Sequence, residues 1–124
     1  METTSPSEEL QQLNSWKEEV NEVRDEVKLM RERLEQIELS KASKDIMTQV
    51  ERFENRLLRQ QEVADEMHHD IKQCAKSISP ASAMIVHNDR PVDNFHAIQR
   101  RMETFQELFV ALKDDFNHFM PANV

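Results

Sequence analysis

Apolar residues recur every three or four positions along the first third of the chain, and charged residues fill most of the positions between them. The stripe consists of Leu13, Trp16, Val20, Val23, Val27, Met30, Leu34 and Ile37. An unbroken alternation of this length is typical of a coiled-coil helix. Ser5, Pro6 and Glu8 precede it as a capping box with proline at the first helical position. The helix is therefore predicted to begin at residue 6, after a disordered segment 1–5.

A second stripe follows in a shifted register, with one polar member, Gln60. It consists of Ile46, Val50, Phe53, Leu57, Gln60, Ala64, Met67, Ile71, Cys74 and Ile78. The first register, if continued, would place Lys41 and Lys44 on the seam, so two interpretations remain open. Residues 6–78 form one long amphipathic coiled-coil helix with a local change of seam, or the chain turns at 40–44. Continuity is preferred, because no glycine or proline marks a corner and lysine and alanine are good helix formers.

A third stripe is rich in phenylalanine and lies on a helix predicted over 91–120, which Pro121 closes. Its members are Phe95, Ile98, Met102, Phe105, Phe109, Leu112, Phe116 and Phe119, and Leu108 and Val110 are expected to widen it. A loop over 79–90, bracketed by Pro80 and Pro91, leads into this helix. The apolar strip 83–86 in that loop either folds back over the helix ends or docks a partner. The helix is expected to return antiparallel and to pack on residues 46–78.

These elements predict an all-α protein, either a long coiled-coil helix with an antiparallel helical hairpin or a three-helix bundle. In the first arrangement the N-terminal stripe overhangs the hairpin and needs another chain to cover it. In the second arrangement the chain closes its own core. The first and third stripes are the predicted protein-interaction seams, because apolar faces of this size must be covered.

Composition and charge narrow the classes of partner. The 124 residues include no glycine and carry a formal net charge of −8. Negative charge disfavours binding to nucleic acids and to anionic membranes. No apolar run is long enough for a membrane span, and no signal peptide is visible at the N-terminus. With a single cysteine there is no internal disulfide. An intracellular location, in cytoplasm or nucleus, is expected.

The densest group of chemically active side chains lies in the second stripe's helix. It comprises Asp65, Glu66, His68, His69, Asp70 and Cys74. Helical pairs four residues apart can bind Zn²⁺, but the second histidine of such a signature is missing here. A solvated helix face with a buried thiol is the preferred interpretation. Glu66 with His69, and Asp115 with His118, only partly match a di-metal carboxylate motif. No catalytic, cofactor-binding or metal-binding residue is predicted.

The function expected from these patterns is non-enzymatic. The chain lacks a glycine-rich phosphate loop and a nucleophile elbow. We expect a structural or assembly protein, a coiled-coil subunit that self-associates as a dimer or tetramer or joins a larger cytoskeletal, chromosomal or vesicle-associated complex. The alternative is a monomeric three-helix adaptor that binds one protein ligand. The expected partners are the chain itself or other helical proteins, with no small-molecule substrate.

Overall fold

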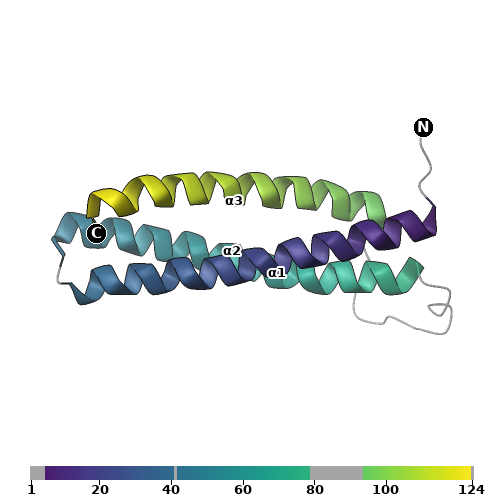
Figure 1. Cartoon of the computed structure of the whole chain (residues 1–124), viewed down its shortest axis with the longest axis horizontal. Coiled ribbons are helices and arrows are strands. Elements are labelled where there is room, and N and C mark those ends of the chain that lie inside the picture. The colour runs from purple at the N-terminus through teal and green to yellow at the C-terminus, as the bar shows by residue number, and fades with distance from the viewer. Residues whose placement is uncertain (1–4, 41, 79–93, 124) are drawn as a thin grey trace.

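Three helices form an elongated bundle in the computed structural model of the chain (Figure 1). The structure describes residues 5–40, 42–78 and 94–123, and in the last range it describes side chains as far as Met120. The helices are α1 (Pro6–Leu39), α2 (Lys44–Ile78) and α3 (Phe95–Asn123). α2 runs antiparallel to α1, and α3 returns beside both, so that α1 and α3 point the same way. At ~1.5 Å per residue, the bundle is a rod about 50 Å long.

The N-terminus of α1 has the predicted cap. The Ser5 hydroxyl accepts a hydrogen bond from the backbone N–H of Glu8 at 3.2 Å, and Pro6 occupies the first helical position. The proline lacks an N–H that would have had no helical partner there, so it favours the start of the helix.

A tight corner separates α1 from α2, so the interpretation of residues 6–78 as one continuous helix is wrong. Ser40 ends α1, and its hydroxyl donates to the carbonyl of Ile37 at 2.6 Å. Ser43 precedes α2 as its cap, and its hydroxyl accepts from the N–H of Ile46 at 3.3 Å. Ser40 has a φ of −82°, which any residue adopts, so α1 ends here without a glycine. The predicted N-terminal overhang is therefore absent, because α1 lies along α2 over its length.

Two clusters of buried side chains fill the interior. The cluster nearer the corner contains Val27, Met30, Leu34, Ile37, Val50, Phe53, Leu57, Phe109, Leu112, Phe116, Phe119 and Met120. The cluster at the other end contains Leu13, Trp16, Val20, Ala64, Met67, Ile71, Cys74, Phe95, Ile98, Met102 and Phe105. Every member of the first and third stripes is buried in one of them except Val23, which is partly buried and packs against both.

Aromatic contacts join α3 to its neighbours at both ends of the bundle. The Phe53 ring meets Phe116 edge-on at 5.7 Å and stacks on Phe119 at 5.1 Å. The Trp16 ring stacks on Phe95 at 5.3 Å, as a core anchor of α1. Offset and edge-on pairs at these distances add to the stabilisation from burial alone. The phenylalanine-rich face is therefore a packing face within the chain.

Three details of the third helix differ from expectation. α3 extends to Asn123, beyond the predicted end at Met120, because a proline in the last turn removes only one helical hydrogen bond. At its start, the Asn94 side chain caps the helix by accepting from the N–H of Ala97 at 2.8 Å. Leu108 and Val110 do not widen the buried stripe, since each is 58% exposed.

The predicted loop 79–90, with the strip 83–86, lies outside the described residues. Within the described helices, no stretch is both long and apolar enough to cross a bilayer.

Candidate functional site

The backbones of α1 and α3 come close to each other at fewer points than those of the other two helix pairs. α1 packs most extensively on α2, whereas α1 and α3 meet at few points. Trp16 and Phe95 hold them together near the start of both helices. Further along, polar side chains bridge the two: Gln106 donates to Glu19 at 3.0 Å, and Lys113 pairs with Glu26 at 3.2 Å. Bulky side chains at a contact increase the distance between helix axes, and the phenylalanines of α3 have this effect here.

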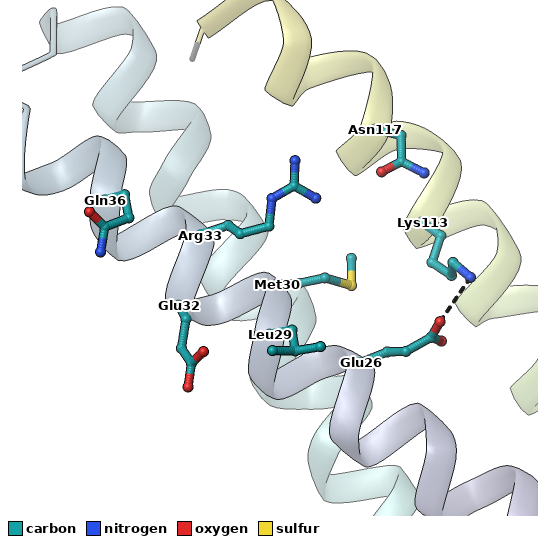
Figure 2. A pocket seen from close by; sticks show the side chains of 8 residues that line it. All are labelled: Glu26, Leu29, Met30, Glu32, Arg33, Gln36, Lys113 and Asn117. Carbon is teal, nitrogen blue, oxygen red and sulfur yellow. Dashed lines mark hydrogen bonds and ion pairs between the residues drawn. The ribbon is translucent and has the colours of Figure 1, made fainter.

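An open groove runs between α1 and α3, and we call it the α1/α3 groove. It consists of two adjoining hollows of about 460 and 410 Å³ that share Glu26. Its apolar surface comes from Val23, Leu29, Met30, Met102, Phe105, Phe109 and Val110. Leu29 and Val110 are 59% and 58% exposed, whereas Met30 and Phe109 are nearly buried. In Figure 2, Met30 projects into the space between α1 and α3, and the Glu26–Lys113 pair crosses it. The groove therefore has a packed floor and exposed apolar edges.

The border of the groove is negatively charged. The lining includes the acidic residues Glu19, Glu22, Asp25, Glu26 and Glu32, and the basic residues Arg33 and Lys113. Lys113 is paired with Glu26, and the Arg33 guanidinium lies 5.4 Å from the Phe116 ring centre. The adjoining surface of α3 adds Glu103, Glu107 and Asp114, with no basic residue among its lining. The groove thus combines apolar edges with an excess of carboxylates.

The cluster considered for metal binding does not converge. Asp65 pairs with Arg24 of α1 at 3.0 Å, while Asp70 pairs with Arg101 of α3 at 2.7 Å. These two aspartates therefore point to different flanks of α2, and Cys74 is buried between the helices. Among the described residues, no group of three or more His, Cys, Asp or Glu side chains is arranged to hold a metal ion. The ion pair of Arg101 with Asp70 links α3 to α2.

Burial and nearby positive charges perturb the pKa of His68, another member of that cluster. Burial lowers the pKa of the His68 imidazole, and Arg24, Lys72 and Lys17 lower it further. The neutral form is favoured in the folded protein, as expected for an imidazole at a partly buried, basic contact. His68 therefore contributes to the α1/α2 interface as an uncharged ring.

Two carboxylates meet across the α1/α2 interface near the corner. A hydrogen bond with Glu38 raises the pKa of Glu54 to about 6, and burial and the negative charge of Glu38 act in the same direction. Arg31 opposes the shift. The two carboxyl groups can share a proton at low pH. At neutral pH both ionise, and the two negative charges then repel each other.

The polar member of the second stripe is buried. Gln60 is 7% exposed, and its Nε2 has no hydrogen-bond partner among the described residues. On α2 it lies between Leu57 of one cluster and Ala64 of the other, so it marks the junction of the two cores. A buried amide without a partner is unfavourable, and such residues are known to specify register in helical assemblies.

The two predicted interaction seams are brought together, but inside the bundle rather than on its surface. The groove was not foreseen, although the sequence carries a signal for it. Leu29 and Val110 each stand directly beside a seam residue, Met30 and Phe109. When the seam residue is buried, the apolar residue next to it in the sequence stays exposed at the edge of the seam. No protein-family model, no curated protein and no solved structure matches this chain.

Proposed function

We propose that this protein is a non-enzymatic helical module that joins a larger complex by binding another protein through the α1/α3 groove. The observation that carries the proposal is the distribution of apolar surface. The two seams are buried within the chain, and two large apolar side chains that remain exposed, Leu29 and Val110, line the same groove. Leu39, Leu58 and Leu108 are also exposed, but none of them lines the groove.

The side chains of the groove support binding better than catalysis. Its apolar part is made of aliphatic, thioether and aromatic groups, and its carboxylates lie on the border. Met30 and Met102 suit a surface that adapts to a partner, because the methionine side chain is flexible and polarisable. Rigid packing below the groove lets it present these groups without rearrangement of the helices.

Self-association is the second candidate, and the charge distribution weighs against it. A two-fold dimer through this groove would place two acidic borders against each other. Each chain already carries a net charge of −8, so the repulsion adds to that of the whole surface. A closed bundle also removes the uncovered N-terminal stripe that had been the main reason to expect a dimer.

Mass and shape in solution, followed by site-specific crosslinking, test the proposal. Light scattering should give a mass near 14.7 kDa for the purified protein. X-ray scattering should show a rod about 50 Å long, the length of three side-by-side helices. A stable dimer or tetramer would favour the second candidate instead.

Crosslinking in cells then asks whether the groove is covered. A photoreactive phenylalanine analogue replaces Leu29 or Val110 in the groove and, as a matched control, Leu108, which has the same exposure as Val110 on the same helix. We expect a discrete heavier product from positions 29 and 110, and none from 108. No product from either groove position would contradict the proposal.

A further inference from the structure

We infer that the partner element bound in the α1/α3 groove is an amphipathic helix with basic residues along its flanks, which completes a four-helix bundle. The inference rests on the proposed function and specifies the kind of partner. Three features of the groove support it: the spacing of its apolar groups, its length and the negative charge of its border.

The spacing of the groove's apolar groups matches a helix. Val23 and Met30 are one heptad apart on α1, and both line the groove. Val110 lines the same hollow as Val23, from the α3 side. A helix lying along the groove would meet these groups with residues seven apart, two turns or about 10 Å along its axis. Apolar anchors at this interval are the usual way in which a helix binds in a groove.

The length of the groove also suits a helix of ordinary size. Its lining runs from Glu19 to Gln36 on α1 and from Met102 to Asn117 on α3. Those segments extend for about 25 Å at ~1.5 Å per residue. A partner helix of about five turns would lie along all of it. A fourth helix along the groove would have the near-parallel packing that is usual in four-helix bundles.

The sign of the charge selects a basic partner. Five acidic and two basic residues line the two hollows, and one of those bases, Lys113, is already paired with Glu26. Glu103, Glu107 and Asp114 extend the negative surface along the outer edge of α3. Lysine or arginine flanking the apolar stripe of a partner helix would meet carboxylates on both borders. Such complementarity mainly raises the association rate and excludes acidic competitors.

The binding test uses two designed peptides of about 20 residues with the same leucine stripe. One carries lysine at its flanking positions, and the other carries glutamate. Fluorescence anisotropy of labelled peptide measures affinity for the full chain at low and high salt. We expect the lysine peptide to bind at least about tenfold more tightly at low salt, and the difference to shrink at high salt as the charges are screened.

Charge reversal on the groove border shows where the peptide binds. Glu22→Lys with Asp25→Lys changes two groove residues of α1 that are exposed. Glu51→Lys with Glu66→Lys makes the same change in net charge at exposed positions of α2 outside the groove. The groove variant should lose the preference for the lysine peptide, whereas the α2 variant should keep it.

A matched pair of apolar substitutions tests the edge of the groove. Val110→Glu should weaken the lysine peptide about tenfold, since it removes an apolar contact, although the added charge is favourable. Leu108→Glu adds the same charge at the same exposure outside the groove and should change affinity by less than about twofold. Circular dichroism confirms that each variant is folded.

The outcomes separate this inference from the proposed function. Equal weakening by the α1 and α2 charge reversals would overturn the inference, because binding would then be non-specific. Tighter binding of the glutamate peptide, or dimerisation through the groove, would overturn it as well. If neither peptide binds while positions 29 and 110 still crosslink in cells, the inference fails and the proposed function stands. If the crosslinks are absent too, both fail.

Discussion

Truncation of one phenylalanine in α3 tests whether the stripe is the core of a closed bundle. Phe116 is 0% exposed and meets the Phe53 ring edge-on at 5.7 Å. Phe116→Ala removes the ring and leaves a cavity, which typically lowers the free energy of unfolding by about 3–5 kcal/mol. The lost ring pair accounts for about 1 kcal/mol of that. At about 4 °C per kcal/mol for a chain of this size, Tm should fall by ~12–20 °C.

Urea unfolding followed by two probes measures this change. Far-ultraviolet circular dichroism reports all three helices, and the emission of Trp16 reports the cluster that does not contain Phe116. If the bundle unfolds cooperatively, both probes shift by the same amount although the substitution is in the other cluster. Leu108→Ala, on the same helix but 58% exposed, is the control and should change stability by less than about 0.5 kcal/mol. A loss below about 1 kcal/mol for Phe116→Ala would refute the assignment of this face to the core.

Three further substitutions address polar features. Gln60→Leu removes a buried amide whose Nε2 has no partner among the described residues, and it should raise the free energy of unfolding by about 1 kcal/mol in urea titrations. A lower free energy of unfolding would show that the amide is hydrogen-bonded. The raised pKa of Glu54 means that the folded protein holds this proton more tightly than the unfolded chain, so stability falls as pH rises from about 4.5 to about 6. Glu54→Gln should flatten that part of the profile of Tm against pH, and raise stability at pH 7 by about 0.5 kcal/mol after solvent screening; an unchanged profile would contradict the shared proton. Ser43→Ala removes the cap of α2 and should lower stability by about 1 kcal/mol in thermal unfolding, whereas no effect would mean that the corner is set by packing alone.

The helical class and the buried faces could be predicted from the sequence. The spacing of apolar residues identified the stripes, and apolar groups at that spacing must be covered whatever the topology. Trp16 and Gln60 were recognised as seam positions from the same pattern, and both are buried. Ser5 was recognised as a cap because its hydroxyl acts on a backbone group only three residues away.

The corner between α1 and α2 could not be predicted with the same rules. Helix propensity differs by only a few tenths of a kcal/mol among ordinary residues, so lysine and alanine do not resist a turn that lets two stripes meet. The serines at 40 and 43 were a signal, since each can bond to the backbone at a helix end. The change of register between the stripes was the second signal.

The groove depends on information that a linear pattern does not contain. Its existence follows from how far α3 lies from α1, which is set by the sizes of the side chains that all three helices bring to one layer. Leu108 and Val110 are similar in the sequence, and both are exposed, yet only Val110 lines the groove. Side-chain direction on a packed helix decides between them.

The order of the helices has a consequence for how the protein assembles. α1 and α2 are joined by the short corner at Ser40–Ser43 and pack on each other most extensively, so their contacts close first and quickly. α3 lies C-terminal to them and leaves the ribosome later. Until α3 has emerged, the paired helices α1 and α2 expose the apolar surface that the phenylalanine face of α3 covers in the folded bundle. Nascent chains paused before α3 should therefore be the species most prone to capture by chaperones.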